Sequence, residues 1–396
     1  MKTEALSFEN TEIAFKSKSN ADLRRAYWLF KLISAGPLVR VGGYFTKVAL
    51  KIGLPIQGIV KNTIFKHFCG GQSIADCEAA IRHLATYHVH TILDYSIERE
   101  NSEAGFNATC EEILRTVERA QKDQHIPFSV FKVSGLGRFD LLQKVNAKEK
   151  LSAAEVREFE NVKTRIDRIC KASFETGLQV LIDAEYSWIQ DIIDELALEM
   201  MRKYNLQKPI VLNTYQLYRT DKLASLKNDF SLAQTHGFYF GAKLVRGAYM
   251  EIERERAEEN GYASPIHATK DATDQDYKEA IFFCLDHLDR IAFMAGTHNK
   301  ESSRMLALEM DRREIAHNHP GVYFAQLLGM SDNLSFNLSS HGYLVAKYMP
   351  YGPVKAVMPY LLRRAQENTS VSGQTSRELN LIIKEIKRRK QSKKSV

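Results

Sequence analysis

The chain is short of the residues that build metal and disulfide sites. Its five cysteines are odd in number, scattered and without a CxxC pair. This pattern argues for a reducing compartment and against a disulfide framework or a zinc site. Two histidine pairs, His88 with His90 and His317 with His319, have no carboxylate or cysteine partner at metal-ligand spacing. We therefore interpret both pairs as structural and predict no metal.

Long apolar runs and a secretory leader are also lacking. Residues 41–60 lean apolar, but two lysines and a proline interrupt them, so we expect no span of a bilayer. Acidic residues precede the first apolar run, which excludes a secretory signal. We expect a cytoplasmic protein.

An excess of positive charge is confined to one end of the chain. The formal net charge is +7, but the segment from Lys384 to Val396 holds seven Lys or Arg and one Glu, a sum of +6 that leaves +1 for the remainder. A nucleic-acid groove spread over the fold is therefore not expected. We expect this basic segment to be a frayed, solvated helix end, with contact to an anionic membrane surface as the weaker option.

The periodicity changes along the chain from helical to alternating strand and helix. Residues 1–85 are mostly helical, with a 3.6-residue pattern in Leu23–Ile33 and in Ser73–His88. Short β-rich runs then alternate with longer amphipathic stretches, as in βα units around a parallel sheet. The predicted strands are His90–Tyr95, Phe128–Ser134, Gln179–Ala184, Ile210–Tyr215, Tyr239–Arg246, Ile291–Thr297, Val322–Leu328 and Tyr343–Tyr348.

Eight such runs predict an α/β protein with a closed (β/α)8 TIM-type barrel. The glycine-rich stretch Ser134–Arg138 lacks the third glycine and the acidic follower of a dinucleotide fingerprint, so a Rossmann domain is disfavoured. We predict three parts: a helical N-terminal arm at 1–85, the barrel at 86–372, and a basic C-terminal helix or tail at 373–396.

Polar residues stand at nearly every C-terminal strand end, where side chains of such a barrel converge on one mouth. They are Asp94, Tyr95, Lys132, Ser134, Asp183, Glu185, Asn213, Tyr215, Gln216, Lys243, Arg246, Tyr249, Thr297, His298, Asn299 and Tyr348. This density predicts a functional mouth.

The segment from Tyr360 to Ser370 predicts an anion site. On a helix, Tyr360, Arg363, Arg364 and Glu367 fall three or four residues apart and share one patch. Two neighbouring guanidinium groups match the two oxygens of a small carboxylate ligand. The alternative is a solvated charged face with an ion pair from Arg363 to Glu367.

Two lysines at strand ends have competing interpretations. Lys243 and Arg246 precede the small residues Gly247 and Ala248, which let a flat or phosphorylated ligand approach the backbone. The alternative is a strand end whose two cations simply extend into water. Lys132 suits a Schiff base, as in aldolases, but a pairing with Asp183 opposes the low pKa which that chemistry requires. We favour an electrostatic role for Lys132.

Taken together, these segments resemble the proline dehydrogenase family, in its stand-alone form. The matching motifs, in the order of the family, are Phe131-Lys-Val-Ser134, Leu181-Ile-Asp-Ala-Glu185, Asn213-Thr-Tyr-Gln216, Lys243-Leu-Val-Arg-Gly-Ala-Tyr249, Gly296-Thr-His-Asn299, Leu327-Leu-Gly-Met330, Tyr348-Met-Pro-Tyr-Gly352 and Tyr360 through Ser370. They cover about residues 90 to 370. The resemblance implies a barrel whose final helix lies over the mouth.

The resemblance also implies the site. FAD is expected on Ala184, Asn213, Lys243, Val245, Arg246, Gly247, Ala248, Tyr249, Thr297, His298, Glu367 and Asn368. L-Proline is expected on Lys132, Leu244, Tyr348, Tyr360, Arg363 and Arg364. Asp183 and Lys243 are the expected catalytic pair. Lys243 stands where relatives often have Arg, and Asn213 where many have Gln.

The implied reaction is oxidation of proline to 1-pyrroline-5-carboxylate, with hydride passing to the flavin N5 and electrons then passing to a quinone. A quinone acceptor implies peripheral membrane contact, at the inner membrane if the protein is bacterial. Two alternatives stay open. One is a Schiff-base lyase that uses Lys132, and the other is a non-catalytic carboxylate-binding module.

Overall fold

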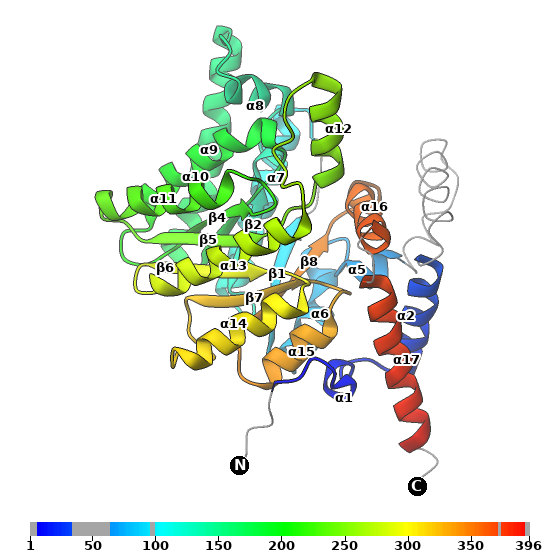
Figure 1. The fold of residues 1–396 in the computed structure, drawn as a ribbon. Coiled ribbons are helices and arrows are strands. Elements are labelled where there is room, and N and C mark those ends of the chain that lie inside the picture. The colour runs from blue at the N-terminus through cyan, green and yellow to red at the C-terminus, as the bar shows by residue number, and fades with distance from the viewer. Residues whose placement is uncertain (1–5, 34–63, 96–99, 371–373, 393–396) are drawn as a thin grey trace. The chain divides into compact units, whose positions relative to one another are not determined.

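A computed structural model describes residues 6–33, 64–95, 100–370 and 374–392. Eight parallel strands close into a barrel in the order β1 to β8, which confirms the predicted fold (Figure 1). The strands are β1 (Val89–Tyr95), β2 (Phe128–Lys132), β3 (Gln179–Asp183), β4 (Val211–Gln216), β5 (Phe240–Val245), β6 (Ile291–Gly296), β7 (Val322–Leu327) and β8 (Val345–Tyr351).

The strands are buried along almost their whole length, as expected for parallel strands covered on both faces. Their register aligns the functional ends. Lys132 of β2 pairs with Asp183 of β3, and Thr214 of β4 pairs with Lys243 of β5. Side chains at the same level on alternate strands therefore point into the same layer of the barrel.

Helices connect the strands and lie outside them in Figure 1. The first group is α7 (Glu103–Gln121), α8 (Phe139–Asn146), α9 (Ala153–Thr176), α10 (Ser187–Tyr204), α11 (Lys222–His236), α12 (Met250–Asn260), α13 (Lys270–Asp286) and α14 (Lys300–Arg312). Local sequence sets their limits. A capping box of Ser152 and Glu155 starts α9, and left-handed glycines follow α9, α11 and α12 at 177, 237 and 261.

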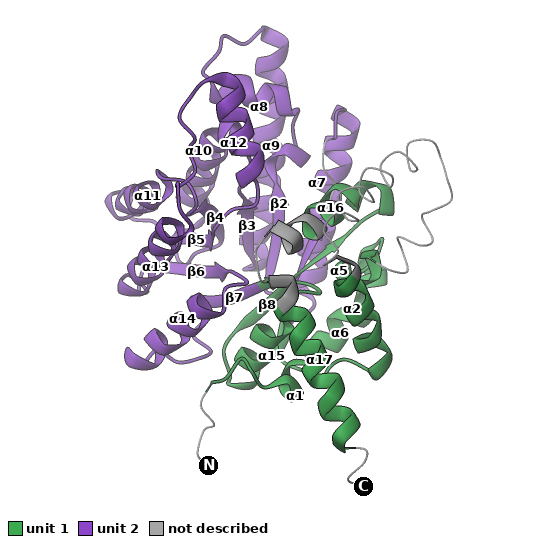
Figure 2. Ribbon diagram, turned by 45° about the vertical axis from the view of Figure 1, so that its right-hand side comes forward, with its two compact units in different colours: residues 1–91, 326–396 green, residues 92–325 purple. Residues whose placement is uncertain are grey.

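The chain packs as two compact units, coloured separately in Figure 2. One unit is 92–325, and the other joins 1–91 to 326–396. The second unit contains α1 (Thr11–Ala14), α2 (Asn20–Ile33), α5 (Lys66–Phe68), α6 (Ile74–Ala85), α15 (Asp332–Ser340), α16 (Val354–Ser370) and α17 (Gln374–Ser392). The three-part division inferred from the sequence stays a prediction.

The basic C-terminal segment is not a frayed end within its described part, so that expectation was wrong. Helix α17 buries Leu381 and Ile382, just ahead of this segment, in a small core with Phe15, Leu23 and Phe30, and Ile386 within the segment packs against that core. Arg389 donates hydrogen bonds to the carbonyls of residues 15 and 18 at 2.8 and 2.9 Å. The basic composition concealed an apolar stripe on one face of the helix.

Candidate functional site

Four charged side chains meet at the C-terminal strand ends in the unit formed by residues 92–325. Lys243 Nζ donates to Asp183 Oδ1 at 2.6 Å, and Lys132 Nζ lies 3.6 Å from Asp183 Oδ2. Lys132 Nζ also lies 4.0 Å from Asp94 Oδ1. The side chains of Lys243, Asp183 and Lys132 are 8%, 13% and 17% exposed, so water screens their charges only weakly. We call Asp94, Lys132, Asp183 and Lys243 the mouth cluster.

The mouth cluster keeps Asp183 ionised. Burial by itself raises the pKa of this carboxyl, but the charges of Lys243 and Lys132 and their hydrogen bonds hold the pKa below its ordinary value. The sequence prediction that Asp183 pairs with Lys132 is confirmed, and Lys243 is the closer partner. An ionised carboxylate between two ammonium groups fixes the position of both cations.

A second buried carboxylate joins the loops that follow β2 and β3. Glu185 accepts hydrogen bonds from the backbone N–H of Ser134, at 2.9 Å, and from its hydroxyl. The backbone of Glu185 is held in turn, because its N–H donates to Gln190 and its carbonyl accepts from Gln216, both at 2.7 Å. These bonds fix the loops directly above Lys132 and Asp183.

The end of β5 points successive side chains to opposite faces. Lys243 points to Asp183, so the pleat turns the fully buried Leu244 toward the other face. Arg246 bonds to Asp274, Thr297 and Ser302 at 2.7, 2.9 and 2.9 Å. The structure thus brings Lys243 to the mouth cluster but does not bring Leu244 there.

Asn213 also lies away from the mouth cluster. Its Nδ2 donates to Asp194 of α10 at 2.8 Å, and Asp194 further accepts from Lys222 of α11 at 2.7 Å. Asn213 pairs in register with Ala242, whereas its neighbour Thr214 pairs with Lys243. The side chain therefore belongs to the helix layer behind β4, and its cofactor contact stays a prediction.

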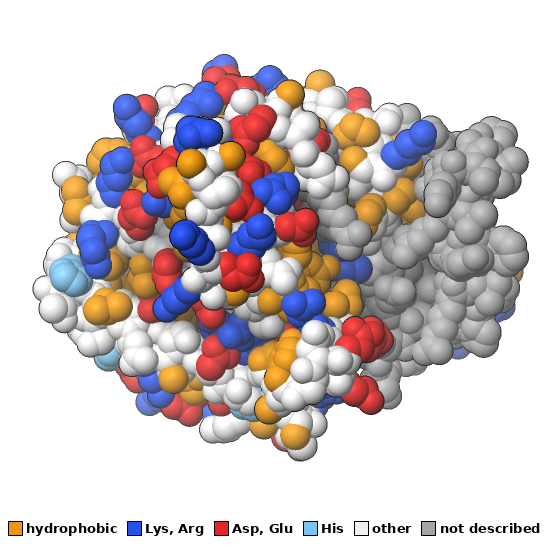
Figure 3. All heavy atoms as spheres, turned by 90° about the horizontal axis from the view of Figure 1, so that it is seen from above, with side chains coloured by type: hydrophobic (Ala, Val, Ile, Leu, Met, Phe, Trp, Pro, Cys, Tyr) orange, Lys and Arg blue, Asp and Glu red, His pale blue; other side chains and the backbone are white. Residues whose placement is uncertain are grey.

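The remaining expected cofactor residues of this unit line the ends of β3, β5 and β6. Gly247 and Ala248 are exposed, His298 and Val245 are partly buried, and Ala184, Tyr249 and Thr297 are buried. Seen from above, side chains of both charge signs are interspersed over the described surface of the molecule (Figure 3). The exposed Gly-Ala pair leaves backbone uncovered beside the cations Lys243 and Arg246.

The expected substrate residues of the other unit lie on β8 and α16. Arg364 is buried, and its guanidinium carbon lies 5.2 Å from the centre of the Tyr360 ring. Arg363 is partly buried. In β8, the ammonium of Lys347 bonds to Asp332 of α15 at 2.7 Å. The next residue, Tyr348, therefore points to the face of β8 opposite that of Lys347. The predicted helix through Tyr360 is confirmed as part of α16. The structure does not describe the side chains of Glu367 and Asn368.

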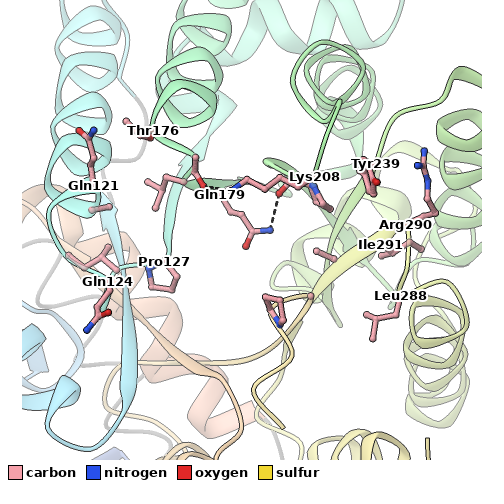
Figure 4. Close-up of a pocket in the computed structure, with 18 of the residues that line it drawn as sticks. Gln121, Gln124, Pro127, Thr176, Gln179, Lys208, Tyr239, Leu288, Arg290 and Ile291 are labelled. Atoms are coloured by element: carbon pink, nitrogen blue, oxygen red, sulfur yellow. Dashed lines mark hydrogen bonds between the residues drawn. The ribbon is translucent and has the colours of Figure 1, made fainter. Parts of the chain in front are cut away.

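A cavity of about 540 Å³ lies at the opposite, N-terminal end of the strands (Figure 4). Its lining includes Pro127, Gln179, Tyr239 and Ile291, which begin or precede β2, β3, β5 and β6. Gln179 donates to the carbonyl of residue 209 at 3.0 Å. This end of a (β/α)8 barrel supports stability rather than chemistry, so we place no active site there.

Metal-binding clusters and membrane-spanning helices are both absent from the described residues. Those residues contain no group of three or more His, Cys, Asp or Glu in metal-binding geometry. Within the same ranges, no helix is both long and apolar enough to cross a bilayer.

The sequence places Asp94 and Glu185 among the strand-end residues of the mouth but assigns neither of them a contact or a specific role. The signal for Asp94 was its place at the end of the first strand. The signal for Glu185 was weaker, because its partner Ser134 lies 51 positions away. Neither contact can be read from local spacing.

The chain is similar to known proteins over most of its length. The family model described as proline dehydrogenase matches residues 77–377. Proline dehydrogenase 1, mitochondrial, from Dictyostelium discoideum is 32% identical, and the match covers 96% of this chain and 74% of that protein. Hydroxyproline dehydrogenase from Xenopus laevis is 30% identical, with 97% and 90% of the two chains covered.

Solved structures carry the same fold. Proline utilization A from Bdellovibrio bacteriovorus, inactivated by N-propargylglycine, superposes with a TM-score of 0.70 at 19% identity. The match covers 96% of this chain and 42% of that one, so this chain spans about two fifths of the larger protein. At this identity the likeness supports the fold alone.

Proposed function

Because this chain belongs to the proline dehydrogenase family, we propose that the mouth cluster is its proline-oxidising site. The protein is an oxidoreductase that acts on proline, and oxidation of L-proline to 1-pyrroline-5-carboxylate is the first step of proline catabolism. The observation that carries the assignment of the site is the 2.6 Å bond between Lys243 and Asp183. It places a fixed, buried positive charge where strand ends of a barrel hold their chemistry.

The family is flavin-dependent, and the residues at the mouth suit FAD. The donor set includes the ammonium of Lys243, the guanidinium of Arg246, the hydroxyl of Thr297 and the exposed backbone of Gly247 and Ala248. Cations and backbone amides are the groups that bind pyrophosphate and an electron-rich ring. When bound, FAD would accept hydride from the substrate carbon next to nitrogen.

Contacts from Ala184, Val245, Tyr249 and His298 belong to the same proposal. So do contacts from Glu367, Asn368 and Asn213. The bond from Asn213 to Asp194 means that its own contact requires a different rotamer or a backbone atom.

Each cation has a distinct proposed role in binding proline. Arg363 and Arg364 bind the substrate carboxylate through paired N–H donors, and Tyr360 stacks on Arg364 to hold its plane. Lys132 adds a further positive charge, which Asp183 and Asp94 keep in place. Tyr348 and Tyr249 wall the imino-acid ring, and Leu244 is left out of this wall because its side chain faces away from the mouth cluster.

The same charges assist the reaction itself. The prolinium nitrogen must lose a proton before its lone pair can assist departure of hydride, and nearby cations favour the neutral amine. Lys243 then stabilises negative charge that develops on the electron acceptor. Asp183 holds Lys243 in position without itself leaving its ionised state.

Electron transfer continues to a quinone, and we propose peripheral contact with the membrane that contains it. Turnover of proline can be measured with an artificial dye as the electron acceptor. The test replaces this dye with a soluble quinone analogue and compares turnover with and without lipid vesicles. Turnover with dye but none with quinone contradicts this part of the proposal.

The Schiff-base lyase remains a weaker alternative. Lys132 lies between two carboxylates, 3.6 and 4.0 Å away, and an ammonium in such a setting keeps its proton and is not a nucleophile. Borohydride reduction in the presence of substrate would trap a Schiff base as a covalent adduct, whereas the proposed site forms none. A trapped adduct at Lys132 would favour the lyase.

Proline-dependent dye reduction with accumulation of 1-pyrroline-5-carboxylate tests the proposed function. Hydroxyproline serves as the parallel substrate, because one relative carries that name. Tyr348 is expected to crowd the ring position that bears the hydroxyl group. We therefore expect a higher kcat/KM for proline than for hydroxyproline. Equal or reversed values would overturn this preference.

A further inference from the structure

Helix α12, which directly follows Tyr249, is attached to its unit by a narrow strip of side chains. Glu253 and Ala257 are its buried residues, at 0% and 2% exposure. The outer face bears Met250 and Ile252, which are 43% and 41% exposed. A helix with so little buried surface opens more easily than the elements around it. Its position therefore depends on the few contacts it makes.

The main polar contact of α12 is a clamp from Glu253 to Ser187. Glu253 Oε1 accepts from the backbone N–H of Ser187 at 2.7 Å, and Oε2 accepts from its hydroxyl at 2.6 Å. Ser187 opens α10, and the N-cap residue Tyr186 supplies no side-chain cap. A carboxylate from another helix thus satisfies donors that the first turn of α10 leaves open, at the positive end of its dipole.

Aromatic side chains extend this clamp to Tyr249. The rings of Tyr186 and Trp188 stack at 4.6 Å, and Tyr249 packs on Tyr186 at 4.4 Å. On the other side of the stack, the guanidinium of Arg256 lies 4.3 Å from the Trp188 ring. Helix α12 therefore holds both ends of an aromatic column, through Tyr249 before its first turn and Arg256 in its interior.

The segment that leads into Tyr249 is fixed from a second direction by Tyr218. A Cβ built on Gly247 would lie 2.4 Å from this ring, so the backbone rests directly on it. Burial, followed by the negative charge of Glu253, raises the pKa of Tyr218 well above its ordinary value. Tyr218 stays neutral and forms a flat support, while Glu253 supplies the lateral restraint.

We propose that Glu253 is a positioning residue that clamps α12 onto the N-terminus of α10 and thereby holds Tyr249 against the substrate. The inference rests on the proposed function, because it takes Tyr249 as a wall of the proline pocket. Loss of the clamp loosens binding of proline more than it slows the reaction of bound proline.

Three variants test the clamp. Glu253→Ala removes both acceptors, and we expect the KM for proline to rise about tenfold while kcat changes less. Glu253→Gln keeps one oxygen for the Ser187 N–H and is expected to restore most of the affinity. Glu255→Ala removes the same charge from an exposed position of the same helix and is expected to match the parent. An unchanged KM in Glu253→Ala overturns the proposal.

A double-mutant cycle separates positioning from general damage. In a Tyr249→Ala background the clamp has nothing left to position, so adding Glu253→Ala should raise KM little further. A full tenfold rise in that background would show that Glu253 acts elsewhere and would overturn the proposal.

Fluorescence gives a readout that does not depend on turnover. The chain has two tryptophans, and Trp28 is 64% exposed, so Trp28→Phe isolates the signal of Trp188. In that background Glu253→Ala is expected to increase quenching of Trp188 by acrylamide, and Glu255→Ala is not. Equal quenching in all variants contradicts the clamp. A parent protein without proline oxidation would refute the proposed function, yet this measurement would still decide whether the clamp exists.

Discussion

Lys243 of β5 reaches across the intervening strand β4 to place its ammonium 2.6 Å from Asp183 of β3. The two residues lie 60 positions apart in the chain, and each is almost fully buried. Charges so close in a poorly screened environment interact strongly, and each is costly to leave alone. Asp183 is therefore the residue on which the electrostatics of the mouth cluster depend.

Asp183→Asn is expected to lower kcat/KM for proline by about 100-fold. The neutral amide leaves two ammonium groups near one another without their shared counter-charge, and breaking a buried charged pair costs about 2–5 kcal/mol. Steady-state dye reduction measures the effect. Asp271→Asn makes the same change at an exposed position of α13 and serves as the control. Similar kinetics for the two variants would remove Asp183 from the site.

Arg363→Met is expected to raise the KM for proline by about 30-fold or more. The variant loses the guanidinium that pairs with the substrate carboxylate, and loss of one partner of such a desolvated charge pair costs about 2–5 kcal/mol of binding free energy. Bound flavin should stay near the parent level, since the guanidinium is assigned to the substrate. Lys355→Met removes a cation from an exposed position of the same helix and is the matched control. Flavin loss with an unchanged KM would assign Arg363 to the cofactor instead.

The partly buried carboxyl of Asp229, in the helix layer behind β4, should make the free energy of unfolding depend on pH. Burial is the largest influence and raises its pKa to about 6, although it accepts a 2.7 Å hydrogen bond from Tyr215. The folded state thus holds the proton more tightly than the unfolded state, whose pKa is 3.8. Stability is lost as pH rises from about 4 through 6, and the full penalty persists above that range.

Asp229→Asn removes this penalty and still accepts from Tyr215. We expect the variant to be more stable than the parent by about 2–3 kcal/mol at pH 8 and by little at pH 4. Urea unfolding at both pH values measures the difference. A stabilisation that is equal at the two pH values would contradict ionisation of Asp229 as its cause.

The buried ammonium of Lys347 should stabilise the unit formed by residues 1–91 and 326–396. Its ammonium is 1% exposed and donates to Asp332 at 2.7 Å and to the carbonyl of Met330 at 2.6 Å. Lys347→Met removes the closer cation of the buried carboxylate and leaves only the weaker contact with Lys18 at 3.4 Å, so it is expected to cost about 3 kcal/mol of unfolding free energy. Lys16→Met, at an exposed position, should leave the unfolding midpoint unchanged. A similar midpoint for both variants would refute the assignment.

The strands could be predicted because parallel strands are buried on both faces. Each therefore stands out in the sequence as a short apolar run, and it can be recognised without knowing which strand lies beside it. The last strand was predicted at 343–348 but occupies Val345–Tyr351, because apolar residues continue through Met349 to Tyr351. Lys132, Asp183 and Lys243 were found because strand ends of a barrel converge.

Asn213 and Leu244 show where this reasoning stops. A strand alternates faces with a period of two, and the sequence alone did not reveal which phase faces the barrel axis. Glu253 had no local signal at all, since its partner Ser187 lies 66 positions earlier. Contacts of this kind depend on how whole helices pack, which residue spacing does not determine.

Anaerobic mixing of the purified protein with L-proline tests the central claim most directly. We expect a yellow protein whose oxidised-flavin absorbance is lost in a single turnover, with one 1-pyrroline-5-carboxylate formed for each flavin bleached, and a much slower loss in Asp183→Asn. A colourless protein, or a flavin whose absorbance proline does not change, would contradict the account.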